Sequence, residues 1–204
     1  MNRQPIVFVV DDDDAVRNSL RLLLKSAGLP TTAFASAQEF LAGWTADQHG
    51  CLVLDVRMPG MSGLELQEEL NRRGAIIPVI FISGHADVPM AVEAIQHGAF
   101  DFLQKPFSDQ DLIDRVQRAL ASDADHRQLL QQRETLRQRY DSLTPREQEV
   151  LQLVTQGKAN KVMAGDLGVS QRTVEIHRAR VMEKMGAQSL AQLVRMVLEL
   201  DKTV

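Results

Sequence analysis

Short apolar runs alternate with amphipathic stretches over the first 122 residues of the chain. Each run has the length and the β-branched or aromatic residues of a buried strand, and apolar residues at helical spacing follow it. The predicted strands are 6–10, 31–34, 50–55, 79–82 and 101–104, and the predicted helices are 15–27, 36–44, 64–73, 88–96 and 109–121. Such alternation is typical of a parallel sheet with helices on both faces. We therefore expect residues 1–122 to form a flavodoxin-like α/β domain with a five-stranded, doubly wound parallel sheet.

Residues 123–141 differ in character, because they contain neither glycine nor proline. Leu129, Leu136, Tyr140 and Leu143 fall near heptad spacing, so we expect a helical linker that can continue the preceding helix. Two interpretations stay open for these apolar positions: they pair with a second copy of the linker, or they lie on their own chain.

Residues 142–204 have the pattern of four short helices. Thr144, Pro145 and Glu147 form a capping box with proline at the first helical position, so the first helix begins there and Gly157 ends it. The other predicted helices are 159–167, 171–185 and 189–200. The middle two, joined by a tight turn, are typical of a helix-turn-helix. We expect an all-α, four-helix domain that contains this motif.

The composition excludes several classes of protein. No apolar run approaches the ~20 residues that span a bilayer, and residues 1–5 lack the layout of a signal peptide. The single cysteine, Cys51, excludes an intramolecular disulfide. We therefore expect a cytoplasmic protein without a membrane partner.

Charge is distributed unevenly along the chain. Residues 1–122 hold 10 Lys and Arg against 16 Asp and Glu, whereas residues 142–204 hold 9 against 7. An acidic first part and a mildly basic last part fit a metal-binding module joined to a nucleic-acid-binding module.

Polar side chains follow four of the five predicted strands. Asp11 and Asp12 follow the first strand, Asp55 ends the third, Ser83 follows the fourth and Lys105 follows the fifth. Ligands of open parallel sheets bind at the carboxyl ends of the strands, so we expect these side chains to converge there. Carboxylates, a hydroxyl and an amine together are suited to phosphate and a divalent cation.

Some of these residues also have ordinary structural explanations. Helix capping and the helix dipole account for Asp13 or Asp14 at the start of the first helix. Lys105 could form only a structural salt bridge. His85 is interpreted as a surface loop residue and not as a base.

The motifs of the chain resemble those of two-component response regulators of the NarL/FixJ class. The receiver motifs are Asp11-Asp12, Asp55 with Met58-Pro59-Gly60, Ser83-Gly84 and Lys105-Pro106-Phe107. The motifs of the LuxR-type helix-turn-helix are Leu143-Thr144-Pro145-Arg146-Glu147 and Val169-Ser170-Gln171-Arg172-Thr173-Val174-Glu175. The resemblance covers nearly the whole chain. It implies a FixJ-like receiver over 1–122, a linker over 123–141 and a DNA-binding domain over 142–204.

The resemblance implies that Asp55 accepts a phosphoryl group from a sensor histidine kinase. Lys105 and Ser83 would bind the phosphoryl oxygens, since such transfer depends mainly on positioning and on neutralising charge. The protein would then catalyse only its own phosphorylation and dephosphorylation, so it is not expected to be an enzyme in the usual sense.

A divalent cation, Mg²⁺ or Mn²⁺, is the implied cofactor. Asp12, Asp55 and the backbone carbonyl of Arg57 are the expected direct ligands, with Asp11 acting mainly through water.

The resemblance also implies a switch. Ser83 would draw its loop toward the phosphoryl group, and Phe102, at a position that is often Tyr, would rotate and repack a surface. Met90, Val92 and Ala94 are expected to contribute to that surface, and plain core packing stays open as the alternative for each of them. The favoured output is a homodimer that binds double-stranded promoter DNA, with RNA polymerase as a further partner.

The third helix of the last domain has one apolar face and one polar face. Its apolar positions are Val174, Val181, Met182 and Met185. Arg172, Glu175 and Ile176 are expected near base edges, since recognition helices read bases with their N-terminal half. The expected phosphate contacts are Arg178, Arg180, Lys184, Lys158 and Lys161. Thr173 either contacts DNA or satisfies a backbone amide.

Two other functions are compatible with parts of this pattern. The chain could be a phosphorylation-independent transcription factor whose receiver is a static dimerisation module. It could also be a Mg²⁺-dependent phosphatase that acts on small substrates through Asp55. The complete set of strand-end residues disfavours the first, and the helix-turn-helix disfavours the second.

Overall fold

The computed structural model describes residues 4–84 and 88–201. The chain divides into two compact units, Met1–Arg127 and Gln128–Val204, each of which has its own hydrophobic core. In the described part of the chain, no helix is long and apolar enough to cross a membrane.

The first unit is built on a five-stranded parallel sheet, as predicted. Its strands are β1 (Ile6–Val10), β2 (Thr31–Phe34), β3 (Gly50–Asp55), β4 (Val79–Ser83) and β5 (Asp101–Gln104). Their order is β2-β1-β3-β4-β5, which is a doubly wound arrangement. Asp55 pairs with Ile82 in register, and Ser83 pairs with Gln104. The register therefore brings the carboxyl ends of the central strands to one edge.

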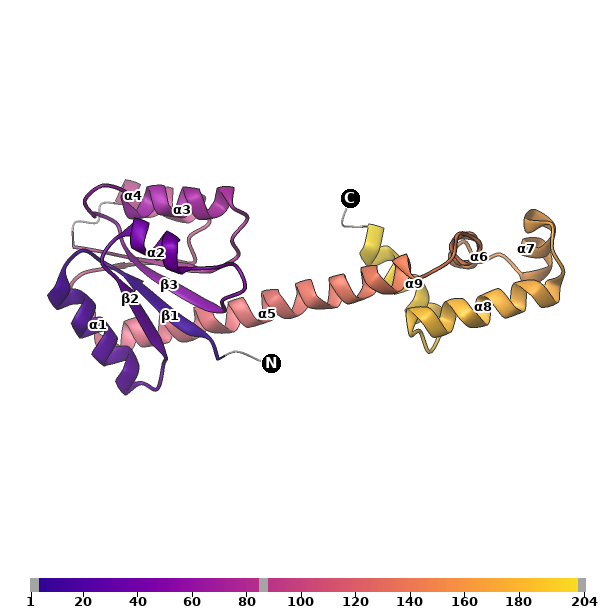
Figure 1. Ribbon diagram of the computed structural model, residues 1–204, viewed down its shortest axis with the longest axis horizontal. Coiled ribbons are helices and arrows are strands. Elements are labelled where there is room, and N and C mark those ends of the chain that lie inside the picture. The colour runs from indigo at the N-terminus through magenta and orange to yellow at the C-terminus, as the bar shows by residue number, and fades with distance from the viewer. Residues whose placement is uncertain (1–3, 85–87, 202–204) are drawn as a thin grey trace. The chain divides into compact units, whose positions relative to one another are not determined.

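Helices cover both faces of this sheet (Figure 1). They are α1 (Asp14–Ser26), α2 (Ala37–Gly43), α3 (Gly63–Arg72), α4 (Val88–Gln96) and the first turns of α5 (Asp109–Asp141). The core between the sheet and α1 with α5 contains Leu20, Leu24, Leu112 and Val116. The core on the other face contains Phe40, Leu66, Leu70 and Ala94. Every residue of β3 is buried, which explains its nearly continuous apolar sequence.

Helix α5 is longer than the last helix predicted for the first domain. It runs without a break from Asp109 to Asp141, so the predicted linker is helical and continues that helix. Leu136 and Leu143 are buried in the core of the second unit, and Tyr140 packs against it. Leu129 is 44% exposed. Three of the four heptad positions therefore pack on their own chain, the second of the two interpretations left open by the sequence.

The second unit contains the four predicted helices that follow α5. They are α6 (Pro145–Thr155), α7 (Asn160–Leu167), α8 (Gln171–Met185) and α9 (Leu190–Asp201). The predicted capping box is present, since Thr144 and Glu147 bond reciprocally at the start of α6. Helix α8 packs against α6 and α7. The pair α7 and α8, joined by residues 168–170, is the predicted helix-turn-helix.

Candidate functional site

Lys105 lies between two buried carboxylates at the carboxyl edge of the sheet. Its Nζ is 2.8 Å from Asp55 Oδ1 and 2.9 Å from Asp11 Oδ2. Asp11 is 1% exposed and Asp55 is 8% exposed. The peptide bond from Lys105 to Pro106 is cis. Residues that follow three different strands thus meet at one point, as their positions in the sequence predicted.

Backbone amides hold the second oxygen of each carboxylate. Asp13 N donates to Asp11 Oδ1 at 2.9 Å, and Arg57 N donates to Asp55 Oδ2 at 2.8 Å. These bonds orient both side chains toward Lys105.

Burial sets the electrostatics of this pocket. It raises the pKa of Asp11, although hydrogen bonds from Lys105 and Asp13 act in the opposite direction. Burial would by itself lower the pKa of Lys105, but its hydrogen bonds to Asp55 and Asp11 outweigh burial and raise that pKa. The lysine is therefore held as a cation. The net effect on Asp11 is a raised pKa, so a further positive charge nearby would stabilise its carboxylate.

The side chains expected to sense the phosphoryl group lie on the neighbouring strands. Ser83 ends β4 and is 2% exposed, and its carbonyl accepts a 2.8 Å hydrogen bond from Lys105 N. Phe102 is half-buried on β5, with its ring centroid 6.2 Å from that of Phe81. Ser83 is thus beside Lys105 along the backbone, and Phe102 lies on β5, which β4 separates from the strand that ends in Asp55.

The donor set fits a hydrated magnesium ion better than a metal held entirely by protein. Asp11 and Asp55 supply buried carboxylate oxygens, whereas Asp12 is exposed. Across the described ranges 4–84 and 88–201, no three His, Cys, Asp or Glu side chains form a group that could hold a metal. Mg²⁺ characteristically uses one or two carboxylates and keeps several waters. The pocket therefore has the chemistry for Mg²⁺ without a dedicated cage.

The remaining acidic residues of the first run have the structural roles considered above. Asp13 is the N-cap of α1 and accepts hydrogen bonds from Ala15 N and Val16 N. Asp14 lies in the first turn and pairs with Arg17. The capping prediction is confirmed for Asp13. His85, which we interpreted as a loop residue, lies outside the described residues.

One prediction for the α4 surface is wrong. Ala94 is fully buried in the core between α4 and the sheet, so it cannot contribute to a surface. Val92 is 48% exposed, and Met90 packs partly against the core. Ile95, three residues after Val92, is also 48% exposed and was missed. Helical spacing from Val92 was the signal that could have found it.

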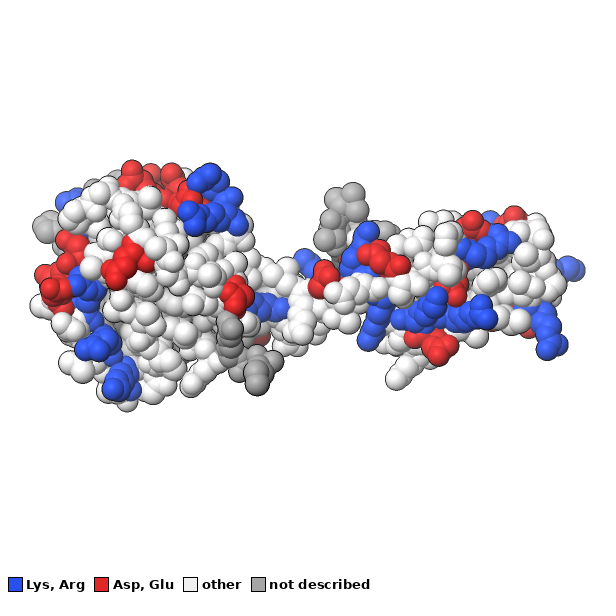
Figure 2. All heavy atoms as spheres, viewed as in Figure 1, with Lys and Arg blue, Asp and Glu red and all other residues white. Residues whose placement is uncertain are grey.

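Helix α8 has the predicted two faces. Val174, Val181 and Met185 are buried in the core of the second unit. The opposite, exposed positions include Arg172, Glu175, Ile176 and Arg180. Figure 2 shows Lys and Arg side chains gathered along α8. Ile176, at 47% exposed, is a large apolar side chain on an otherwise polar face.

The residues expected to contact phosphate differ in whether they already bond to other residues of the protein. Lys158 pairs with Asp166 at 2.7 Å, and Arg178 donates to Asn160. Lys184 donates to Glu147 Oε2 at 2.6 Å. By contrast, Lys161, Arg172 and Arg180 make no ion pair with any residue that the structure describes.

Thr173 has local partners in the turn before α8. Its amide donates to Ser170 Oγ at 3.1 Å, and the two hydroxyls lie 2.8 Å apart. Among the described residues, the Thr173 hydroxyl therefore bonds the Ser170 hydroxyl, and no bond from a backbone amide to it is present.

The pocket and the helix-turn-helix together define a class of protein: a receiver domain followed by a DNA-binding domain. The model of the response regulator receiver domain matches residues 7–117, and that of bacterial regulatory proteins of the luxR family matches residues 141–197. The chain therefore belongs to the response regulators that join a receiver to a LuxR-type DNA-binding domain. Its fold class and its assignment to the FixJ-like group are as predicted.

Similar proteins extend over nearly the full chain. The transcriptional regulatory protein FixJ of Azorhizobium caulinodans is 52% identical over 94% of this chain and 91% of FixJ. Nodulation protein W of Bradyrhizobium diazoefficiens is 50% identical over 94% of this chain and 84% of that protein. The solved structure of the response regulator StyR is 49% identical and superposes with a TM-score of 0.91, covering 97% of this chain and all of StyR. Full-length FixJ from B. japonicum is 39% identical, with a TM-score of 0.59 over 100% of both chains.

Proposed function

We propose that this response regulator accepts a phosphoryl group on Asp55 from a phosphohistidine of a sensor kinase and then binds promoter DNA as a dimer. The observation that carries the proposal is Lys105 Nζ, placed between Asp55 Oδ1 and Asp11 Oδ2 at the carboxyl edge of the sheet. A lysine in this position offsets the negative charge that would otherwise repel an incoming phosphoryl group.

The transfer breaks the bond between phosphorus and the kinase imidazole nitrogen and forms a bond between phosphorus and a carboxylate oxygen of Asp55. Arg57 N holds Asp55 Oδ2, which leaves Oδ1 as the oxygen that exchanges its contact with Lys105 for the phosphorus. Lys105 and Ser83 then bind phosphoryl oxygens. Hydrolysis reverses the modification, since water takes up the phosphoryl group and the Asp55 carboxylate is restored.

Asp55, Asp12, the carbonyl of Arg57 and, through water, Asp11 are the groups we assign to Mg²⁺ or Mn²⁺. When bound, the cation neutralises charge between the carboxylates and the phosphoryl oxygens. The buried carboxylate of Asp11 supports this assignment, because burial raises its pKa and a nearby cation would favour its ionised form.

Two exposed apolar surfaces support dimerisation of the respective units. On α4, Val92 and Ile95 are each about half exposed. On α9, Leu190, Val194 and Leu198 recur every four residues, and Leu190 and Leu198 are 44% and 55% exposed. Pairing of either surface with its copy would be isologous, which matches palindromic DNA sites.

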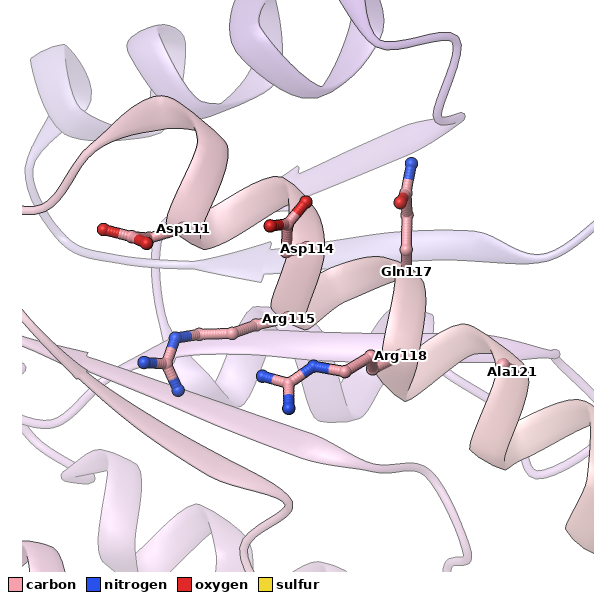
Figure 3. A pocket seen from close by; sticks show the side chains of 6 residues that line it. All are labelled: Asp111, Asp114, Arg115, Gln117, Arg118 and Ala121. Carbon is pink, nitrogen blue, oxygen red and sulfur yellow. The ribbon is translucent and has the colours of Figure 1, made fainter.

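A charged surface lies on α5 close to β5. Arg115 and Arg118 both pair with Asp101 of β5, and Figure 3 shows these two arginines extending side by side from α5. Asp111 and Asp114 line the same shallow pocket. A surface of mixed charge can complement a second copy of itself and so select the partner of the receiver.

Phosphorylation of Asp55 is tested directly by incubating the chain with a small phosphodonor and Mg²⁺ and measuring the intact mass. The wild-type chain should gain one phosphoryl group, and Asp55→Asn should gain none. Asp14→Asn is a matched control from the acidic run, because Asp14 pairs with Arg17 outside the pocket. Labelling of Asp55→Asn equal to that of the wild type would overturn the proposal.

DNA binding is tested by selecting duplexes from a randomised library with the phosphorylated chain. The proposal expects a palindromic site, and a chain that enriches no sequence would contradict it.

RNA polymerase remains an expected partner at such promoters. FixJ and StyR are named as a transcriptional regulator and a response regulator, and we propose for this chain likewise no catalysis beyond its own phosphorylation and dephosphorylation.

A further inference from the structure

The last turn of the recognition helix α8 is held by polar contacts that its apolar core does not explain. Lys184 Nζ donates to Glu147 Oε2 at 2.6 Å and to the carbonyl of Ser142 at 3.2 Å. Arg139, near the end of α5, donates from Nη1 to the carbonyl of Met185 at 3.1 Å. These five residues, which we call the α8 lock, join the end of α5 and the start of α6 to the C-terminal turn of α8.

Glu147 is the buried member of the α8 lock. It is 2% exposed, and the same oxygen that binds Lys184 also accepts a 2.9 Å hydrogen bond from Thr144 N. The receiver contains the same capping motif at α3, where Ser62 and Glu65 bond reciprocally, but Glu65 is exposed. Capping alone therefore does not require a buried glutamate, and the difference between the two sites is Lys184.

Arg139 approaches the end of α8 at a glycine. Gly186 caps the helix at a φ of 69°, and a Cβ at this position would lie 2.8 Å from Arg139 Nη1. A side chain here would strain the backbone and displace the guanidinium. The cation also faces the negative end of the helix dipole, which favours this contact.

Apolar and polar contacts constrain α8 in different ways. Val181 and Met185 bury one face of the helix, but hydrophobic contacts are non-directional and tolerate small rotations. Hydrogen bonds lose strength when distance or angle changes, so the α8 lock restricts both the rotation and the tilt of the last turn. A helix of 15 residues is about 22 Å long, so a tilt of about 5° at one end moves the other by about 2 Å.

We propose that Lys184 is a positioning residue that, with Glu147 and Arg139, orients the base-reading half of α8, and is not a phosphate contact. This inference rests on the proposed binding of α8 to DNA and replaces the role that we first expected for Lys184. Its charge is already offset by Glu147, whereas Lys161 has no ion pair among the described residues. The two lysines should therefore affect DNA binding in different ways.

The test measures binding of the full chain to the selected duplex and to an unrelated duplex over a range of salt concentrations. Lys184→Met should weaken binding to the selected duplex about tenfold and leave binding to the unrelated duplex unchanged. The slope of log affinity against log salt should also be unchanged. Lys161→Met should instead weaken both and reduce the slope by about 0.9, the value for one phosphate contact.

Two further variants and one control separate positioning from stability. Lys184→Arg, which can bond Glu147 and the Ser142 carbonyl, should restore most of the discrimination between the duplexes. Glu147→Gln should reproduce the loss, whereas Glu65→Gln, at the exposed capping box of the receiver, should leave DNA binding unchanged. The thermal midpoint of each variant shows whether the second unit is folded at the temperature of the binding assay.

Three outcomes would overturn the inference. One is a Lys184→Met chain whose salt slope falls by about one and which binds both duplexes more weakly, because Lys184 would then contact phosphate. Another is a folded Lys184→Met chain that discriminates between the selected and the unrelated duplex as well as the wild type does. A wild-type chain that binds no duplex would overturn the proposed function as well, so the two failures are distinguishable.

Discussion

At the scale of single residues, the pocket depends on how burial and charge are balanced around Lys105. Asp11 and Asp55 are buried with one lysine between them, and each carboxylate keeps one oxygen on a backbone amide. This arrangement holds Asp55 in place and leaves its Oδ1 on an exchangeable side-chain contact. The pocket is therefore preorganised around Asp55, and it can accept a further cation beside Asp11.

Lys105→Met should slow labelling by a small phosphodonor about 10- to 100-fold, because one preorganised cation is removed from the site of charge development. The measurement is the initial rate of mass increase in Mg²⁺. Lys25→Met, in the last turn of α1, is the matched control and should react at the wild-type rate. An unchanged rate in Lys105→Met would mean that the lysine forms only a structural salt bridge.

Glu147 makes the stability of the second unit depend on pH. Hydrogen bonds from Lys184 and Thr144 lower its pKa from an ordinary 4.5 to about 2. The folded state thus binds this proton less readily than the unfolded state, so the contribution is complete above about pH 4.5 and disappears as the pH falls toward 2.

Glu147→Gln should therefore cost about 1–2 kcal/mol at neutral pH, a figure reduced for the partial exposure of Lys184, and less near pH 3. Urea unfolding of wild type and variant at several pH values measures the difference. A difference that is independent of pH between 7 and 3 would show that the Glu147–Lys184 charge pair is not its source.

At the scale of elements, the start of the α5 extension is attached to the receiver. Asp123 is 3% exposed and accepts hydrogen bonds from Arg127 Nε at 2.8 Å and from Gly50 N at 3.0 Å. Arg127 also donates to the carbonyls of Ala46 and Gln48. The carboxylate and guanidinium thus join the first turns beyond the predicted helix end to the loop before β3.

Arg127→Met should destabilise the receiver by about 3 kcal/mol, because it leaves the Asp123 carboxylate buried without its cation. The midpoint of denaturant unfolding measures the loss. Arg133→Met, at an exposed position of the same helix, should stay within about 0.5 kcal/mol of the wild type. Equal midpoints for the two variants would contradict the structural role of Arg127.

Elements and strand-end chemistry could be predicted from the sequence, because both depend on local order along the chain. Strand lengths, the capping box at Thr144 and the meeting of Asp11, Asp55 and Lys105 follow from apolar patterning and the parallel topology. The pairing of Lys184 with Glu147 and the contacts of Arg127 with the carbonyls of Ala46 and Gln48 could not be predicted, because they join segments that are far apart in the sequence. Ala94 was misassigned because helical spacing alone does not show which face meets the sheet.

At the scale of the whole molecule, each unit has its own core, and α5 belongs to both along the sequence. The heptad-like leucines illustrate the limit of a pattern, because Leu136 and Leu143 are used by the core of the second unit. These two leucines are therefore not available to the dimer that we propose, whereas Val92 with Ile95 on α4 and Leu198 on α9 are exposed.

Phosphorylation of Asp55 is proposed to control assembly, and sedimentation mass in Mg²⁺ tests this most directly. The wild-type chain should shift from monomer to dimer when a small phosphodonor is added, and Asp55→Asn should remain a monomer under both conditions. A dimer in every condition would contradict the account and favour a static dimerisation module. A wild-type chain that carries the phosphoryl group and remains a monomer would show that phosphorylation does not act through dimerisation.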